Sequence, residues 1–381
     1  MPLDPFFSER LRVHRRYLFD QALGTVRSRV RSLLDPLRLP WSAASAPSGQ
    51  GSASRQPHAA PTGTAAGAAP AGTAAGARAA GPGPRARARA KHRRAALAWD
   101  RTELRTVGTP GPGIRTTEHE VDVPGYPAVR VRIYHPDADG PVPGVLAFFG
   151  GAFRIGGIDY PTTDAAFRRR AADAGVAMVA VDYALAPEHR YPTQVEQAHA
   201  ALEWLFDNAD ALGVDAGRIA VAGTSAGANV AAALTLLNRD RGRRPLRLQV
   251  LEVPVVDLTG RMLDLRATRA LGVPNVLARR ELRSVARTYL PRAELAREPY
   301  ASPLRATSHA DLPPAVILTA EYDPLRGDGD AYGAALRTAG VDASVVRYQG
   351  VTHDTPVFTG ALPAARRWHD DVVSALRRLH T

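Results

Sequence analysis

A short serine motif flanked by glycines is the strongest chemical signal in the sequence. Residues 223–227 read Gly-Thr-Ser-Ala-Gly, directly after an apolar run at residues 219–222 and before a helical pattern. A serine on such a strand-to-helix turn is exposed as a nucleophile, because small neighbours let the turn close tightly. The N–H of Ala226 then lies at a helix N-terminus, where the dipole favours developing negative charge. Ser225 is therefore the predicted nucleophile.

The predicted nucleophile needs a general base, and on this kind of turn the base comes later in the chain. Three histidines follow residue 309, and two of them, His369 and His380, lie in the last helical pattern. His353 instead lies in a loop just after the apolar run at residues 344–348. This loop is at the carboxyl edge of the expected sheet, from which a histidine could reach the serine. His353 is therefore the predicted base.

The acid that orients the base is expected after the preceding strand. The apolar run at residues 315–319 leads into a segment rich in carboxylates. Asp323 is the preferred acid, because the chain between it and the predicted base has room for one helix and one strand. Glu321, Asp328 and Asp330 remain alternatives, although carboxylates after a strand are usually solvated or cap the next helix.

Two glycines after another expected strand have the features of an oxyanion hole. The apolar run at residues 142–149 leads directly into Gly150 and Gly151. Glycine lets the backbone approach a ligand closely and direct its N–H groups toward it. Together with the N–H of Ala226, these two glycines would supply three donors to the oxyanion of a tetrahedral intermediate. The predicted oxyanion hole is thus Gly150, Gly151 and Ala226.

Strands alternate with helices from about residue 116 onward, and this alternation positions the candidate residues. Apolar or alternating runs predict strands at residues 129–134, 142–149, 176–181, 219–222, 246–253, 315–319 and 344–348. Helical patterns lie between them, near residues 162–174, 194–210, 227–238, 327–339 and 362–379. Such alternation predicts an α/β fold with a mostly parallel sheet and helices on both faces.

Several segments resemble the hormone-sensitive-lipase-like branch of the α/β-hydrolases, in the same order along about residues 100–380. The most specific is residues 182–189, which read Asp-Tyr-Ala-Leu-Ala-Pro-Glu-His and are close to that family's signature. The other matching segments resemble the oxyanion loop, nucleophile turn, acid segment and histidine loop, at residues 149–153, 223–227, 321–326 and 350–354. The resemblance implies an eight-stranded sheet, a helical cap over the site and a triad of Ser225, Asp323 and His353.

Three positions depart from the family pattern at the expected site. Phe149 stands where the family's oxyanion loop has histidine, Ala152 replaces its third glycine, and Thr224 replaces the aspartate of the nucleophile turn. The backbone N–H groups of Gly150 and Gly151 survive these changes. A phenyl ring cannot make the hydrogen bond with which the histidine supports the loop. We therefore expect packing to hold this loop, with Phe149 against Phe148 or Phe153.

The net charge of +12 is concentrated in the first hundred residues. They carry 16 Lys/Arg against 5 Asp/Glu, whereas residues 101–381 carry 33 against 32. Residues 41–98 are mostly small residues, proline and arginine, and we predict a disordered linker because they bury too little apolar surface. The basic stretch Arg85–Arg94 is interpreted as a solvated part of this linker. No nucleic-acid partner is expected.

The linker separates two segments of different character. Residues 1–40 have apolar residues at helical spacings and are predicted to form a helical arm that packs as part of the cap. The catalytic domain is expected at residues 99–381, with a cap insertion at about residues 258–300 where the strand–helix alternation is interrupted. Cysteine is absent, which excludes disulfides and thiolate chemistry. No apolar run is long enough to predict a membrane span.

These features predict a serine hydrolase of carboxylic esters, either short to medium acyl esters or lactones, that needs no metal or cofactor. The alternatives are a lyase or tailoring enzyme of secondary metabolism, and a non-catalytic small-molecule sensor on the same fold. Polar residues such as Asp20, Gln21 and Arg27 interrupt the segment that would form an export signal. A cytoplasmic location is therefore expected.

Overall fold

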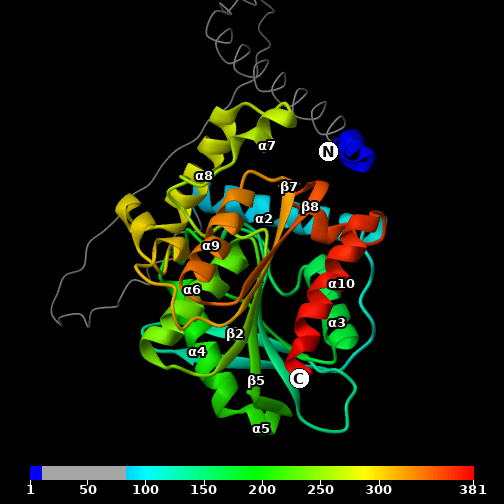
Figure 1. Ribbon diagram of the computed structural model, residues 1–381, viewed down its shortest axis with the longest axis vertical. Helices are drawn as coiled ribbons and strands as arrows, with labels where there is room; N and C mark the ends of the chain where they lie inside the picture. The colour runs from blue at the N-terminus through cyan, green and yellow to red at the C-terminus, as the bar shows by residue number, and fades with distance from the viewer. Residues whose placement is uncertain (11–82) are drawn as a thin grey trace, which may run out of the picture. The chain divides into compact units, whose positions relative to one another are not determined.

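An eight-stranded β-sheet forms the centre of the structure, a computed structural model that describes residues 1–10 and 83–381 (Figure 1). Its strands are β1 (Thr116–Val123), β2 (Tyr126–Tyr134), β3 (Val142–Phe148), β4 (Ala177–Val181), β5 (Val214–Thr224), β6 (Leu246–Glu252), β7 (Ala315–Tyr322) and β8 (Ala343–Thr352). They lie in the spatial order β1-β2-β4-β3-β5-β6-β7-β8. The pairs β1–β2 and β2–β4 are antiparallel, and all the others are parallel. The predicted mostly parallel, eight-stranded sheet is confirmed.

Burial of the central strands explains why the sequence reveals them. All five residues of β4 are buried, and so are six of the seven residues of β3. Continuous apolar runs are typical of parallel strands that helices cover on both faces. In contrast, β1 lies at the edge of the sheet, is mostly polar and has only two buried residues. It is therefore the strand that the apolar runs do not predict.

Helices cover both faces of the sheet, as predicted. The α-helices are α2 (Pro84–Thr106), α3 (Pro161–Ala174), α4 (Thr193–Asp207), α5 (Ala209–Leu212), α6 (Ala226–Arg241), α7 (Leu265–Ala270), α8 (Asn275–Tyr289), α9 (Arg326–Thr338) and α10 (Pro363–Arg377). Short 3-10 helices are η2 (Ala293–Arg297), η3 (Pro303–Arg305), η4 (Thr355–Val357) and η5 (Arg378–His380). Figure 1 shows α3 and α10 on one side of the sheet and α4, α6 and α9 on the other. The core therefore lies in two layers, one on each face.

The prediction that a disordered linker extends to residue 98 is wrong, because α2 begins at Pro84. Alanine and arginine dominate this stretch, and both have high helix propensity. Arg89 and Arg93 each donate a hydrogen bond of 2.7 Å to the carboxylate of Glu188. Although burial opposes the charge of Glu188, these two arginines lower its pKa to about 2. Part of the basic stretch is thus paired on a helix, which composition alone does not reveal.

Most of the predicted N-terminal arm, and the part of the predicted linker before residue 83, lie outside the described residues. Residues 5–10 are helical. Residues 1–9 belong to the same compact unit as Ala88–Thr381. Phe7 packs against Phe358, with ring centroids 5.5 Å apart. Among the helices that the structure describes, none has both the length and the apolar character needed to cross a membrane.

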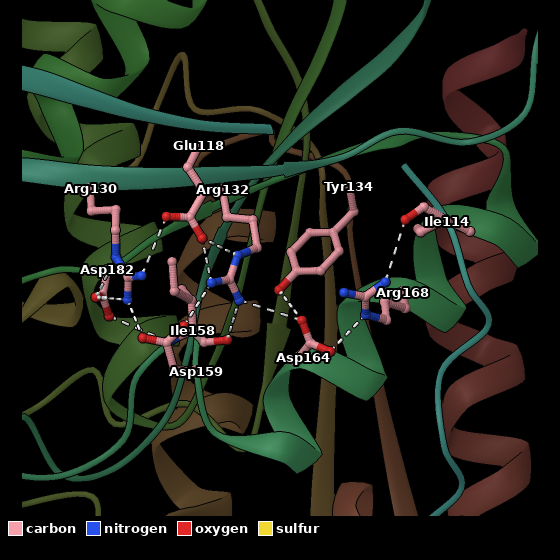
Figure 2. A network of polar contacts seen from close by, with 10 residues as sticks. All are labelled: Ile114, Glu118, Arg130, Arg132, Tyr134, Ile158, Asp159, Asp164, Arg168 and Asp182. Carbon is pink, nitrogen blue, oxygen red and sulfur yellow. Dashed lines mark hydrogen bonds and ion pairs between the residues drawn. The ribbon is translucent and has the colours of Figure 1, made fainter. Parts of the chain in front are cut away.

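A network of ion pairs fixes the loop that leads into α3 (Figure 2). Arg130 and Arg132 of β2 both contact Asp159 in this loop. Arg130 also donates to the carboxylate of Asp182 at 2.9 Å, and the other oxygen of Asp182 accepts the N–H of Ile158 at 3.3 Å. A single exposed ion pair contributes little to stability, but a connected set restricts the loop in several directions. This loop is continuous with the glycine-rich segment after β3.

Asp100 of α2 caps the N-terminus of α3. Its carboxylate accepts the backbone N–H of Thr162 at 3.0 Å and also the hydroxyl of the same residue. Tyr160, the N-cap residue of α3, makes no side-chain hydrogen bond of this kind. A carboxylate at this position satisfies a free N–H and interacts favourably with the helix dipole. The contact therefore joins α2 to α3.

Replacing Asp100 with alanine should lower the free energy of unfolding by about 1–2 kcal/mol, because α3 loses its cap. Urea unfolding followed by circular dichroism measures the change. Asp139→Ala is the matched control, since Asp139 is exposed in the loop before β3. This replacement should lower the free energy of unfolding by less than about 0.5 kcal/mol. Equal stability of Asp100→Ala and the unmodified protein would show that the cap contributes nothing.

Candidate active site

Ser225 lies in a sharp turn between β5 and α6, as predicted. Its φ and ψ are 55° and −114°, a conformation that residues other than glycine rarely adopt. The neighbouring glycines make the turn possible. A Cβ on Gly223 would lie 2.3 Å from the carbonyl oxygen of Gly227, and a Cβ on Gly227 would lie 2.2 Å from the carbonyl oxygen of Phe148. Both glycines of the motif are therefore required by close backbone packing.

Ser225, His353 and Asp323 form a continuous chain of hydrogen bonds. Nε2 of His353 is 3.0 Å from Oγ of Ser225, and Nδ1 is 2.7 Å from Oδ2 of Asp323. The other oxygen of Asp323 accepts the N–H of Leu325 at 2.9 Å, and the residue is 1% exposed. Because Nδ1 faces a carboxylate it carries the proton, which leaves Nε2 to accept the serine proton. The structure thus brings together three residues that the sequence separates by up to 128 positions.

The carboxylates considered as alternatives to Asp323 have other partners. Glu321 accepts a backbone N–H of β8 at 2.7 Å, and Asp330 pairs with an arginine of β8. Asp328 is fully buried and accepts two backbone N–H groups from the segment after β6, at 2.8 and 2.9 Å. Burial raises the pKa of Asp328 to about 8. Of these four residues, Asp323 is the one hydrogen-bonded to His353.

The surroundings of His353 favour its protonated form. Burial opposes a charge on the imidazole, but the adjacent Asp323 carboxylate outweighs burial and, with Asp354, raises the pKa of His353 to about 9. Its side chain is 32% exposed. The same carboxylates would stabilise the imidazolium that forms when His353 accepts a proton. However, only the neutral fraction of the imidazole can accept one.

The glycine-rich segment after β3 lies beside Ser225. A Cβ on Gly150 would lie 3.5 Å from the Cβ of Ser225. Gly151 has a φ of 136°, and a Cβ there would lie 2.0 Å from the carbonyl oxygen of Ile155. Within residues 1–10 and 83–381, no backbone hydrogen bond occupies the N–H of Gly150 or Gly151. Ala226 is the first residue of α6, where an N–H has no partner within the helix.

Aromatic stacking supports this segment. The ring of Phe149 is parallel to that of Tyr183, with centroids 4.2 Å and planes 6° apart. The hydroxyl of Tyr183 donates to the carbonyl oxygen of Phe149 at 2.7 Å. Four residues on, Phe153 stacks on Tyr289 of α8 at 3.8 Å. Packing and the hydrogen bond of Tyr183 therefore hold the loop, but the ring on which Phe149 stacks is Tyr183 rather than the expected Phe148 or Phe153.

A cavity of about 390 Å³ adjoins Ser225 and His353. Its wall includes the glycine-rich segment, the beginning of α3 and three residues of α2, namely Ala96, Trp99 and Asp100. Trp99 is 53% exposed, so its indole lies at the rim. No sequence pattern pointed to α2 as part of the site, because its first half lies in the segment of small residues and arginine. In the part of the chain that the structure describes, no three His, Asp or Glu side chains gather as a metal site requires.

Comparison with known proteins identifies the fold family. A family model described as alpha/beta hydrolase fold matches residues 145–357, more than half of the chain. The chain belongs to this α/β-hydrolase family. The matched segment runs from β3 to the end of η4 and so contains Ser225, Asp323, His353 and the two glycines after β3, although not the residues of α2 that line the cavity.

Several proteins with sequences similar to this α/β-hydrolase are named esterases. Esterase LipI of Mycobacterium tuberculosis is 39% identical over 272 residues, which are 70% of this chain and 82% of the relative. The arylesterase of Saccharolobus solfataricus is 36% identical, over 62% of this chain and 75% of the relative. The solved structure of EstE1, a thermophilic carboxylesterase from a metagenomic library, has a TM-score of 0.71 and 37% identity, covering 77% of this chain and 98% of its own. The predicted resemblance to the hormone-sensitive-lipase-like branch is confirmed.

The raised pKa of His353 leads to a pH prediction. Nuclear magnetic resonance titration of its imidazole should give a midpoint near the pKa of about 9, above the ordinary value of about 6.5. If the neutral imidazole accepts a proton during the reaction, kcat/KM should rise with pH up to the same midpoint. Asp354→Asn removes a nearby negative charge and should lower the midpoint, whereas the exposed Asp139→Asn should leave it unchanged. A midpoint at or below the ordinary value would contradict the assigned environment.

Proposed function

We propose that this α/β-hydrolase cleaves carboxylic esters, with Ser225 as nucleophile, His353 as general base and acid, and Asp323 as the group that orients the imidazole. The proposal rests chiefly on the hydrogen-bond chain from Ser225 through His353 to the buried Asp323. The adjoining cavity gives a substrate access to this chain. The esterase names of the relatives support the same reaction. The proposed reaction requires neither a metal nor a cofactor.

In the first half of the reaction, Oγ of Ser225 attacks the ester carbonyl carbon while Nε2 of His353 accepts the hydroxyl proton. The carbonyl oxygen becomes an oxyanion, to which the N–H groups of Gly150, Gly151 and Ala226 donate, each contributing about 3 kcal/mol. The bond to the alcohol oxygen then breaks. Nε2–H of His353 protonates the departing oxygen, which leaves the acyl group on Ser225.

In the second half, water hydrolyses the acyl-enzyme. Nε2 of His353 accepts a proton from water as the water oxygen attacks the acyl carbon, and the same donors bind the new oxyanion. Collapse of this intermediate expels Oγ of Ser225, which regains the proton from His353, and releases the carboxylic acid. The His353 side chain is partly exposed and lines the cavity, so water can approach it there.

We infer that the substrates are small esters with short or medium acyl groups, or lactones. The cavity volume of about 390 Å³ is near the lower end of the range of about 300–1,000 Å³ that is typical of small-molecule sites. Apolar side chains, including Trp99, Phe167 and Val357, line the cavity and suit an acyl chain. The half-exposed indole of Trp99 would limit how far that chain can extend.

We further propose that residues 258–300 form part of a cap, within a catalytic domain of residues 99–381. The segment contains α7 and α8, which lie between β6 and β7. Tyr289 of α8 stacks on Phe153, and Arg154 forms an ion pair with α8. These contacts join α8 to the loop beside the nucleophile. The N-terminal arm, residues 1–40, was also predicted to pack as part of the cap. Most of this arm lies outside the described residues.

Ser225→Ala should lower kcat for an activated ester such as p-nitrophenyl butyrate by about 10⁴-fold or more, because the triad acts as a unit. The variant should also lose covalent labelling by a fluorophosphonate probe. Ser308→Ala is the control, because Ser308 is exposed and far along the chain from the turn, and both readouts should stay unchanged. Full esterase activity in Ser225→Ala would refute the proposed nucleophile. An unmodified protein without turnover or labelling would favour the sensor or the lyase instead.

Trp99→Ala should broaden the range of acyl lengths, because truncation opens the rim of the cavity. The ratio of kcat/KM for p-nitrophenyl octanoate to that for the butyrate should rise several-fold, on the scale of about 1 kcal/mol in transition-state binding. This ratio does not depend on the fraction of active enzyme. Trp204→Ala on α4, which is not among the residues lining the cavity, is the control and should leave the ratio unchanged. An unchanged ratio in Trp99→Ala would exclude Trp99 as a determinant of chain length.

A further inference from the structure

Glu252, the last residue of β6, is a buried carboxylate beside the nucleophile turn that the proposed reaction does not use. The residue is 1% exposed, yet both of its carboxylate oxygens have partners. Oε1 accepts the hydroxyl of Thr224 at 3.0 Å. Oε2 accepts a guanidinium N–H of Arg170 from α3 and the indole N–H of Trp368 from α10, both at 2.8 Å. Donors from three separate elements therefore meet on one carboxylate.

The backbone of Glu252 contacts the same turn. Its carbonyl oxygen accepts the N–H of Ser225 at 2.8 Å. In the parallel pairing of β5 and β6, Thr224 lies opposite Glu252. One residue thus holds the turn twice, through its main chain at Ser225 and through its side chain at Thr224.

The donors on Oε2 restrict how the carboxylate can move. Arg170 is 6% exposed and compensates the charge of Glu252, and the Trp368 side chain is fully buried. A buried ion pair of this kind is weak evidence for a gain in stability, because desolvation offsets the attraction. However, two donors on one oxygen fix the plane of the carboxylate. Oε1 is therefore held toward the hydroxyl of Thr224.

Thr224 also occupies the position at which the nucleophile turn differs from that of the hormone-sensitive-lipase-like family, which has aspartate there. An aspartate there would place a second carboxylate against Oε1 of Glu252, and like charges at hydrogen-bond distance repel strongly in a buried site. A threonine hydroxyl instead donates a hydrogen bond to the same oxygen. Thr224 and Glu252 are therefore chemically matched to each other.

We propose that Glu252 is a positioning residue for the nucleophile, acting through the Thr224 hydroxyl and the Ser225 N–H to keep Oγ of Ser225 directed at Nε2 of His353. The proposal rests on the ester hydrolysis proposed above, because positioning is measured through the reactivity of Ser225. The unusual φ of Ser225 persists only if surrounding contacts hold it. A displacement of about 1 Å at a reacting group can lower a rate by about 10²-fold.

Removal of the Thr224 hydroxyl tests the proposal with a nearly isosteric change. Thr224→Val should lower kcat for p-nitrophenyl butyrate, and the rate of fluorophosphonate labelling, roughly tenfold each with little change in KM. Thr224→Ser restores a hydroxyl donor and should recover most of both losses. Thr235→Val is the matched control, since Thr235 is a buried residue of α6 whose hydroxyl donates to the Ala232 carbonyl. It should change the melting temperature but not the reactivity of Ser225.

A second pair of variants separates the hydrogen-bond donor from side-chain size. Thr224→Asn keeps an N–H donor for Oε1 of Glu252, whereas Thr224→Asp presents an ionised acceptor of the same shape. Labelling should be several-fold slower in the aspartate variant than in the asparagine variant, because only the aspartate repels Glu252. Melting temperatures recorded for both variants show whether each one is folded.

The outcomes distinguish this inference from the proposed function. If unmodified protein is labelled and Thr224→Val is labelled just as fast, the positioning role is overturned while the esterase proposal stands. The role is also overturned if Thr224→Ser does not recover the loss, if the aspartate and asparagine variants behave alike, or if Thr235→Val loses as much reactivity as Thr224→Val. If unmodified protein is neither labelled nor active, the proposed function fails and the inference fails with it.

Discussion

The positive φ of Ser225 is the constraint on which the other parts of the site depend. A side chain in this conformation needs a turn so tight that Gly223 and Gly227 have no room for a Cβ. This turn also needs a buried parallel strand before it and the N-terminus of a helix after it. The sheet order places β3 and β6 on either side of β5. The glycine-rich segment after β3 and the end of β6 therefore reach the serine together.

The local patterns predicted the sheet and the chain of Ser225, Asp323 and His353, because each depends on features close together in sequence. Buried parallel strands leave continuous apolar runs, and the carboxyl ends of such strands meet at one edge of the sheet. Strand context also favoured Asp323 over its neighbours, and the structure gives the physical reason, since the rivals bind backbone groups or an arginine. Edge strand β1 has no such signal, because water rather than protein covers much of it.

Contacts between distant elements could not be predicted from these patterns. The linker was expected to reach residue 98 because composition indicates only how much apolar surface a segment can bury by itself. Composition does not indicate which hydrogen bonds and ion pairs distant residues make with that segment. Glu188 pairs with the arginines of α2, and Asp100 binds the start of α3. Glu252 is a similar case, since its carboxylate joins residues 170, 224 and 368 of the chain. A lone glutamate at the end of an apolar strand has no sequence pattern that would reveal three such partners.

The position of α2 in the chain has a consequence for how such a protein can diverge. This helix precedes the whole sheet and contributes Trp99 to the cavity wall, whereas the reacting groups follow β5, β7 and β8. None of the hydrogen bonds that join Ser225, His353 and Asp323 involves a residue of α2. Mutation can therefore change the cavity wall on one element while the groups of the hydrogen-bond chain are inherited unchanged on others. The shape of the cavity and the geometry of the serine turn are in this sense separately heritable traits of a single chain.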